Sequence, residues 1–314
     1  MEFASRIDGH MHACGHDTHT AMLVGAARML AGHRDRLAGR VLFMFQPGEE
    51  GHHGARYMLD EGLLDVPPLR DGTASPVTGA FAIHITSSMP TGSVATKGGP
   101  LMASADTFAI HIRGRGGHAS EPYRAVDPIP VACEVVQALQ TMVTRRIDVF
   151  DPAVVTVGRL VAGTTNNVIP ESAVIEGTIR TVSEQTRAIV HDRLRRVAEG
   201  VAMAHGTEVT VDLDIGYPVT SNADGFADTT LSVATELLGD RRVARMPNPI
   251  MGAEDFSYVL ERVPGTMAFL GATEPDRDPR RAAPNHSNLV RFDEDAMPTG
   301  VALYSAMALH HLTG

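Results

Sequence analysis

His10-Met-His-Ala-Cys-Gly-His-Asp-Thr-His-Thr20 is a stretch of eleven residues that holds four histidines, one cysteine and one aspartate. If this segment is extended, Cys14 and His16 stand two residues apart and project from the same face. A thiolate and an imidazole form a ligand pair for zinc or another divalent first-row metal. Gly15 lets the backbone bend between them, and Asp17 can cap a following helix or orient an imidazole. The stretch predicts a metal site beside a helix N-terminus, with a histidine-rich polar turn as the alternative.

Length and composition limit the classes of protein to consider. The chain has 314 residues, which suggests two domains, and its 27 basic and 37 acidic side chains give a formal charge of -10. That charge argues against nucleic acid and against anionic membrane surfaces as partners. No apolar run approaches the ~20 residues of a membrane span, and MEFASRIDG at the N-terminus lacks the hydrophobic stretch of a signal peptide.

Cysteine usage bears on the compartment. Two cysteines in so long a chain suggest no disulfide framework, so we expect a reducing, cytoplasmic location. Cys133 lies in an apolar stretch with helical spacing and is expected to be an inert core thiol. Cys14 is therefore the cysteine with a chemical role in prospect.

The chain before residue 99 alternates predicted helices and strands. Residues 20–30 and 54–64 have helical spacing, whereas 40–45 and 78–85 are nearly continuous apolar runs. A continuous apolar run suits a strand that is buried on both faces of an α/β sheet. The pattern is βαβ-like, so ligands should gather at the carboxyl ends of the strands.

Candidate site residues follow both predicted strands. Glu49 and Glu50 come directly after the first, where adjacent residues of an extended turn point in different directions. One carboxylate can therefore hold a metal while the other faces a bound water, and a solvated turn is the alternative. His84 lies near the end of the second strand, where a lone histidine is more often a satisfied core residue than a ligand.

The pattern changes to β-α-β-β-α-β between residues 99 and 214, which is the order of a ferredoxin-like sandwich. The expected strands cover 106–113, 154–161, 173–182 and 207–215, and the expected helices cover 127–146 and 183–205. The sequence therefore predicts an inserted domain at 99–214. Residues 1–98 and 215–314 then form one discontinuous metal-binding domain, in which His286 can reach the same site as Cys14 and Glu50.

Six motifs occur along the chain in this order: MHACGHDTHTAML, FQPGEEGHHGARYM, GRGGHASEP, NNVIPESAVIEGTIR, MGAEDFS and HSN. With these motifs the chain resembles the hippurate hydrolase and indole-acetyl-amino-acid hydrolase family of di-metal amidohydrolases, within the aminoacylase and carboxypeptidase group. The resemblance covers essentially the whole chain. It implies an α/β fold, with a di-metal peptidase catalytic domain and an inserted ferredoxin-like α+β domain that serves as lid and dimerisation domain.

The resemblance also implies a set of metal ligands. Motif by motif, these are Cys14, His16, Glu50, His84 and His286. The implied cofactors are two divalent metal ions, zinc or manganese, with nickel and cobalt as alternatives. Such ions make a bound water nucleophilic near neutral pH.

Catalytic and substrate-binding roles are implied in the same way. Glu49 matches the general base, which takes a proton from water and passes it to the leaving amine. His118 matches a catalytic residue that stabilises an oxyanion. Asn167 and Arg180 match substrate-binding residues, and Arg180 can pair with a carboxylate. Glu254 is a further candidate, although a carboxylate in the first turn of a helix explains it nearly as well.

The implied reaction is metal-dependent hydrolysis of the amide bond of an N-acyl amino acid, either hippurate-like or with an acetyl or aryl-acyl group. A short peptide is a further substrate class, and a homodimer through the inserted domain is expected. Two departures from the family stand out. Family members carry a further segment before the Cys-His stretch, and its absence would expose a sheet edge. His52 and His53 stand where small residues are more usual, so they can disturb or supplement the site.

Two readings from other classes of protein stay open. The first is a truncated, inactive relative that binds metal or peptide, and a hydrolysis assay separates it from an enzyme. The second is a thiol hydrolase that uses Cys14 as nucleophile with a nearby histidine. Chelation separates that one, because a thiol enzyme should survive the removal of metal.

Overall fold

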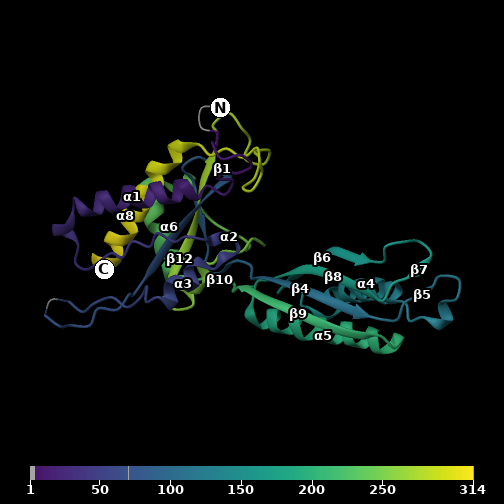
Figure 1. Ribbon diagram of the computed structural model, residues 1–314. Coiled ribbons are helices and arrows are strands. Elements are labelled where there is room, and N and C mark those ends of the chain that lie inside the picture. Colours follow the sequence, from purple (N-terminus) through teal and green to yellow (C-terminus); the bar gives the residue numbers. More distant parts are fainter. Residues whose placement is uncertain (1–3, 70, 314) are drawn as a thin grey trace. The chain divides into compact units, whose positions relative to one another are not determined.

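The computed structural model describes residues 4–69 and 71–313, and the chain divides into two compact units (Figure 1). The first unit comprises Met1–Leu101, Ser221–Asn248 and Tyr258–Gly314, and the second comprises Met102–Thr220 and Pro249–Ser257. Residues 1–3, which begin the segment predicted to lack a signal sequence, lie outside the described residues. The chain crosses between the units after residues 101, 220, 248 and 257, so the second unit is inserted in the sequence of the first.

The first unit is built on a mixed four-stranded sheet. Its strands, in the order β1-β12-β2-β11, are β1 (Ala80–Pro90), β12 (Gly265–Thr273), β2 (Val94–Thr96) and β11 (Val243–Arg245). β1 runs parallel to β12, and β2 runs antiparallel to it. Every residue of β12 is buried, as expected for a strand with neighbours on both sides.

The helices α1 (His16–Ala31), α6 (Asp224–Leu238) and α8 (Met297–Thr313) pack against this sheet. The shorter helices are α2 (Glu49–His52), α3 (Gly54–Asp60) and α7 (Ser257–Leu260). Figure 1 shows α1 lying alongside α8, and these two helices pack on each other. Their core includes the fully buried Met22, Ile85, Leu270 and Leu303. Gly300 allows the close approach, because a Cβ there would lie 2.1 Å from the Met22 sulfur.

The predicted buried strand at 40–45 was wrong. Residues 41–48 are not paired in a sheet, and the side chains of Leu42 and Phe45 are 48% and 45% exposed. An apolar run makes a strand only where a neighbouring strand completes its hydrogen bonds. Among the described residues β1 pairs on one side only, with β12.

The second unit has the ferredoxin-like fold that the sequence predicted. Its antiparallel sheet has the order β6-β8-β4-β9, with β6 (Ala153–Ala162), β8 (Ser172–Thr181), β4 (Ala105–Arg113) and β9 (Glu208–Tyr217). The helices are α4 (Pro128–Arg146) and α5 (Glu184–His205). A small ribbon is added by β5 (Gly117–His118) and β7 (Val168–Ile169), and β3 (Gly99–Met102) pairs with β10 (Thr220–Asn222).

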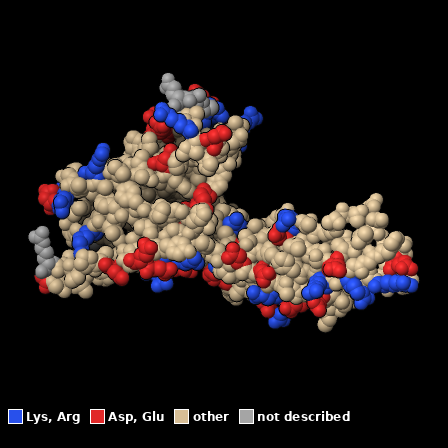
Figure 2. All heavy atoms as spheres, viewed as in Figure 1, with Lys and Arg blue, Asp and Glu red and all other residues tan. Residues whose placement is uncertain are grey.

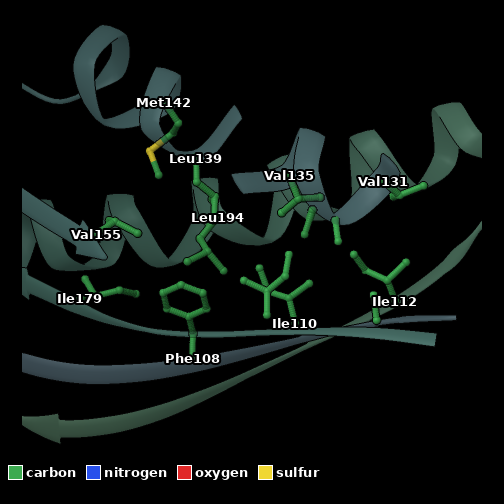
Figure 3. Packing of buried hydrophobic residues seen from close by; sticks show 14 of the residues in the cluster. Phe108, Ile110, Ile112, Val131, Val135, Leu139, Met142, Val155, Ile179 and Leu194 are labelled. Carbon is green, nitrogen blue, oxygen red and sulfur yellow. The ribbon is translucent and has the colours of Figure 1, made fainter. Parts of the chain in front are cut away.

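Alternation along β4 explains how the second unit forms its core. Phe108, Ile110 and Ile112 are buried on one face, and the residues between them are more exposed. Figure 3 shows these side chains directed at Val135 of α4 and Leu194 of α5. A strand with one buried face and two amphipathic helices is the pattern from which this sandwich was predicted.

One detail of the predicted division and one predicted burial differ from the structure. Residues 249–257 were placed in the catalytic domain but belong to the second unit, because Ala103 N–H donates to the carbonyls of Ile250 (3.1 Å) and Gly252 (2.8 Å). Cys133 was expected in the core, yet it lies exposed on α4. The apolar stretch that contains Cys133 does form a helix with a buried face, but the side chain of Cys133 lies outside that face.

The surface shows no broad region of one charge on the face drawn in Figure 2, where acidic and basic side chains are interspersed. No helix among residues 4–69 and 71–313 is long and apolar enough to cross a membrane. Exposed large apolar side chains are scattered, and the most exposed of them is Phe150 at 93%.

A buried ionic cluster ties α5 to the sheet of the second unit. The Asp106 carboxylate accepts hydrogen bonds from Arg187 Nε (2.9 Å) and the Gly216 N–H (3.0 Å), and His191 Nε2 lies 2.8 Å from it. Burial by itself would raise the pKa of Asp106, but the hydrogen bonds from Arg187 and His191 lower it to about 2. Asp106 therefore folds as a charged, fully bonded group.

Replacing Asp106 by Asn should destabilise the second unit by about 3 kcal/mol, because the buried Arg187 loses its buried charge partner and keeps only the half-exposed Glu184. The stability due to ionised Asp106 is present above the ordinary carboxyl pKa of about 4 and is lost as the pH falls towards about 2. Urea unfolding of parent and variant should therefore differ most at neutral pH and converge below pH ~2.

Glu176→Gln is the matched control, because it breaks the exposed Arg159–Glu176 pair and should change stability little. Equal unfolding midpoints for parent and Asp106→Asn at neutral pH would contradict the stabilising role of the cluster.

Candidate metal centre

The Cys14–His16 segment is a tight turn and is not extended as predicted. Gly15 has φ 84°, in the left-handed region, and α1 begins at the next residue. A Cβ on Gly15 would lie 2.5 Å from the side chain of Ile85, so glycine is required there on two counts. Asp17 does not cap α1, because the cap position is Gly15 and no side chain bonds there.

His84 lies inside β1, which continues beyond the predicted end to Pro90. Its Nδ1 donates to the Ile85 carbonyl (2.7 Å), because a carbonyl oxygen can only accept. The proton of the neutral ring is therefore on Nδ1, and Nε2 presents a lone pair. Nε2 lies 3.3 Å from the sulfur of Cys14, so two ligand-type atoms converge.

The two adjacent glutamates stand in a turn that we call the acidic turn, residues 47–54. Gly48 and Gly51 have φ 67° and 80°, and Glu50 between them departs from helical geometry with ψ 74°. Glu49 Oε2 lies 3.8 Å and Glu50 Oε1 3.9 Å from His16 Nε2. The turn thus directs both carboxylates to the same imidazole.

His286 joins this group from the other end of the first unit's sequence. Its Nε2 lies 3.2 Å from Glu50 Oε1, and its backbone N–H donates to the Ala13 carbonyl (2.8 Å). The neighbouring Asn285 amide donates to the carbonyls of Cys14 (3.2 Å) and Ile85 (3.0 Å). Sequence reasoning missed Asn285, although it stands directly beside the HSN motif.

All five predicted ligands therefore meet within the first unit. Together with Glu49, these residues form three groups among the described residues, and within each group all ligand atoms lie within 4.8 Å of one another. The groups are Cys14, His16 and His84; Cys14, Glu50 and His286; and His16, Glu49 and Glu50. One thiol, three imidazoles and two carboxylates are a donor set that suits zinc and related divalent ions. The residues present fit a metal.

Protonation favours the same interpretation. Burial lowers the pKa of His84 to about 4. Burial also lowers the pKa of His16, against the opposing effect of Glu50. Both rings are therefore neutral near pH 7, which is the form that binds a metal.

His19 is a second residue that sequence reasoning missed. Its Nε2 accepts a hydrogen bond from the Ile85 N–H (2.8 Å), and its ring centroid lies 4.7 Å from that of His84. Burial, followed by the charge of a protonated His84, lowers the pKa of His19 well below its ordinary value. The available signal was the spacing of His16 and His19, which puts both on one face of α1.

In the second unit, His118 and Asn167 lie side by side. Ala119 N–H donates to the Asn167 carbonyl (3.1 Å), and β5 pairs with β7 at these positions. The Ser120 N–H donates to His118 Nδ1 (3.1 Å), and the Ser120 hydroxyl lies 2.7 Å from the same atom. Because a backbone N–H can only donate, the neutral His118 ring carries its proton on Nε2.

Arg180 lies far from this pair, at the other end of the sheet. β4 and β8 pair from Arg113–Ser172, next to β5 and β7, to Asp106–Ile179. Arg180 is thus eight residues beyond Ser172, or ~26 Å at ~3.3 Å per residue. Burial lowers the pKa of Arg180, and the charge of Asp106 opposes this effect. Within one chain, Arg180 therefore lies apart from the other predicted substrate-binding residue, Asn167, and from the predicted catalytic residue His118.

Glu254 belongs to the second unit, as do His118, Asn167 and Arg180. It is buried, its carbonyl accepts from Thr220 Oγ1 (3.3 Å), and its carboxylate accepts from the Phe256 N–H (3.3 Å). These contacts give it a structural role in the loop before α7.

The ligand set extends from the buried His84 to the exposed Glu50 and His286. Together with a carboxylate pair on a turn, in an α/β unit with an inserted ferredoxin-like unit, it is typical of a hydrolytic metalloenzyme. The model of peptidase family M20/M25/M40 matches residues 1–310, and the chain belongs to that family. It is thus an enzyme that acts on amide bonds, as the resemblance of its motifs implied.

Known relatives agree with this assignment. The chain is 37% identical to an N-acetylcysteine deacetylase of Bacillus subtilis, over 98% of this chain and 76% of the relative. It is also 37% identical to IAA-amino acid hydrolase ILR1-like 2 of Arabidopsis thaliana, over 99% and 68%. Among solved structures, the Bacillus subtilis YXEP protein, described as a dinuclear metal binding peptidase of the M20 family, has a TM-score of 0.81 at 33% identity. That match covers 99% of this chain and 76% of the other.

Replacing Cys14 by Ala should weaken metal binding more than about 100-fold, since second-layer changes alone cost 10- to 100-fold. Cys133→Ala is the matched control, because that thiol lies exposed on α4 of the second unit. Metal content after dialysis, measured by mass spectrometry, tests both variants. Unchanged metal content in Cys14→Ala would reject its role as a ligand.

Proposed function

We propose that this protein hydrolyses the amide bond of N-acyl amino acids in a metal-dependent reaction. The observation that supports this most directly is the convergence of the acidic turn, with Glu49 and Glu50, on His16 at 3.8 and 3.9 Å. The two relatives act, by their names, on N-acetylcysteine and on amino acids conjugated to IAA. The substrate would then be a small acyl amino acid with an acetyl, benzoyl (as in hippurate) or indole-acetyl group, or a short peptide.

We further propose that the site holds two divalent ions, zinc or manganese. Cys14, His16 and Glu50 each belong to two of the three ligand groups, so the residues present would supply enough donors to hold two ions. The similar Bacillus subtilis structure is described as dinuclear. A thiol with this role must stay reduced, which suits the cytoplasm.

The proposed reaction assigns a proton path to Glu49. When bound, the ions supply an activated water and polarise the amide carbonyl. Glu49 is 16% exposed at its side chain, against 52% for Glu50, so it is the better shielded base. It takes the proton from the water and gives it to the amide nitrogen, which leaves as the free amine of the amino acid. Glu50, which also lies 3.2 Å from His286, then serves as a ligand.

His118 is proposed to donate to the carbonyl oxygen of the substrate. The Ser120 N–H keeps Nδ1 as an acceptor, so Nε2 is the donor and can stabilise negative charge on that oxygen. Arg180 and Asn167 are proposed to bind the carboxylate of the amino acid. A small acyl amino acid is much shorter than the ~26 Å that separates Arg180 from the strand end beside His118, at ~3.3 Å per residue. One chain therefore does not supply both contacts to one substrate.

A homodimer through the second unit would resolve this separation, and we propose β6 as its contact. β6 is the last strand of its sheet, so no strand among residues 4–69 and 71–313 pairs with its outer side, which leaves that side available to an antiparallel copy of itself. Val154, Leu160 and Val161 on β6 are each more than 40% exposed, and Phe150 just before it is 93% exposed. Apolar side chains along an open strand suit a symmetric contact between two copies.

Glu49→Gln should keep its metal and lose turnover by about 10² to 10⁴, because amide replaces the proton acceptor at the same size. Glu50→Gln should lose metal first and activity as a consequence, so this adjacent substitution is the matched comparison. Metal content and hydrolysis of N-acetyl, benzoyl and indole-acetyl amino acids are measured on the parent and both variants.

The outcomes separate the alternatives. Loss of metal from Glu49→Gln with retention in Glu50→Gln would reverse the two roles. A parent protein that binds metal but hydrolyses none of the substrates would favour an inactive relative. A parent protein whose hydrolytic activity persists after chelation would point to thiol chemistry at Cys14.

Leu160→Lys and Phe150→Glu should each weaken self-association by more than about 10-fold, because a charge would enter an apolar strand contact. Met203→Lys is the control, since Met203 is 80% exposed on α5, away from β6. Sedimentation velocity over a range of concentrations measures the dimer. A parent that sediments only as a monomer would contradict the proposal.

A further inference from the structure

His53 and His286 are the residues other than glycine that have positive φ within residues 4–69 and 71–313, at 54° and 69°. Side chains disfavour this region, although histidine tolerates it better than most residues do. His286 is part of the candidate metal centre. His53 is the next-to-last residue of the acidic turn, at a position where glycine would adopt the same backbone conformation without strain. The contacts of its side chain therefore determine what a histidine contributes there.

The His53 side chain is bonded to Tyr258 on α7. His53 Nδ1 and the Tyr258 hydroxyl share a hydrogen bond of 2.9 Å, and the two ring centroids lie 6.0 Å apart. The guanidinium of Arg56, one turn further along α3, lies 6.0 Å from the Tyr258 ring centre. Tyr258 thus contacts His53, which lies inside the acidic turn, and Arg56, which lies two residues beyond it, and all three belong to the first unit.

The acidic turn is closed tightly across its base. The Gly54 N–H donates to the Gly48 carbonyl (3.3 Å), and a Cβ on Gly54 would lie 1.6 Å from the carbonyl oxygen of Pro47. Glu49 and Glu50 lie between these ends. The φ angle of His53 directs the chain into that closure, so it also decides how the two carboxylates are presented.

We infer that His53 and Tyr258 are positioning residues for the carboxylate pair. Their hydrogen bond holds His53 in the left-handed conformation, which fixes the closure of the acidic turn and the approach of Glu49 and Glu50 to His16. What the carboxylates then do rests on the proposed function, whereas the locking of the turn does not. By holding the acidic turn in this way, His53 supplements the site at a position where small residues are more usual in the family.

Tyr258→Phe removes the hydroxyl, and His53→Asn removes the ring while keeping a residue that tolerates the left-handed region. Tyr57→Phe is the matched control, because Tyr57 also lies beside Arg56 but is 55% exposed on α3. Amide hydrogen exchange is followed by mass spectrometry on metal-free protein. Exchange within residues 47–56 should become about 5-fold faster in Tyr258→Phe and in His53→Asn, the worth of one hydrogen bond, and stay at the parent rate in Tyr57→Phe.

Competitive titration with Zn²⁺ then tests the link to the carboxylates. The apparent affinity should fall about 5-fold in each single variant, and the double variant should be no weaker than either single one, because both remove the same bond. A merely structural contact would lower the melting temperature without this coupled loss of zinc affinity.

The results distinguish the inference from the proposed function. Parent-like exchange in Tyr258→Phe would overturn the locking of the turn, and parent-like zinc affinity in both single variants would overturn the positioning role. A parent chain that binds no Zn²⁺ would reject the proposed function, and the exchange of metal-free protein would still decide whether the turn is locked.

Discussion

The candidate metal centre depends on the hydrogen bonds made by the backbone N–H and C=O of Ile85. β1 stands at the end of its sheet, so the backbone groups on its outer side have no strand to bond. The Ile85 carbonyl accepts from His84 and from Asn285, and its N–H donates to His19. Two residues that are remote in sequence, His19 and Asn285, together with the neighbouring His84, thereby bond both backbone polar groups of Ile85. The same bonds set the tautomer of His84 and bring Cys14 and His286 to it.

The acidic turn shows how the chain places charge where folding alone would not favour it. Adjacent carboxylates repel each other, and a run of left-handed residues is disfavoured for most side chains. Glycines at 48 and 51 remove most of the backbone cost, and the imidazoles of His16 and His286 lie within 4 Å of the carboxylates. A turn that is strained and rich in charge is an expected feature of a site that binds cations.

The second unit depends on different interactions. Its core comes from alternation along β4 and from the apolar faces of α4 and α5, while the buried Asp106–Arg187 pair joins helix to sheet. These features account for folding and leave the ribbon of β5 and β7 free to display His118. The orientation of that ring is set locally by Ser120, through a backbone N–H that no substitution other than proline removes.

The sequence by itself determined the ferredoxin-like unit, because periodicities of 2.0 and 3.6 residues report directly which side chains can be buried together. It also indicated the chemical roles of Cys14 with His16 and of Glu49 with Glu50, because the members of each pair lie close together along the chain. Only the tertiary structure decided that residues 41–48 remain unpaired and that Asn285 and His19 bond to Ile85. It also decided that Arg180 lies at the end of β8 far from the ribbon of β5 and β7 that carries His118. Local pattern specifies what a segment can form, whereas hydrogen-bond partners and distances between remote residues depend on which segments pack beside it.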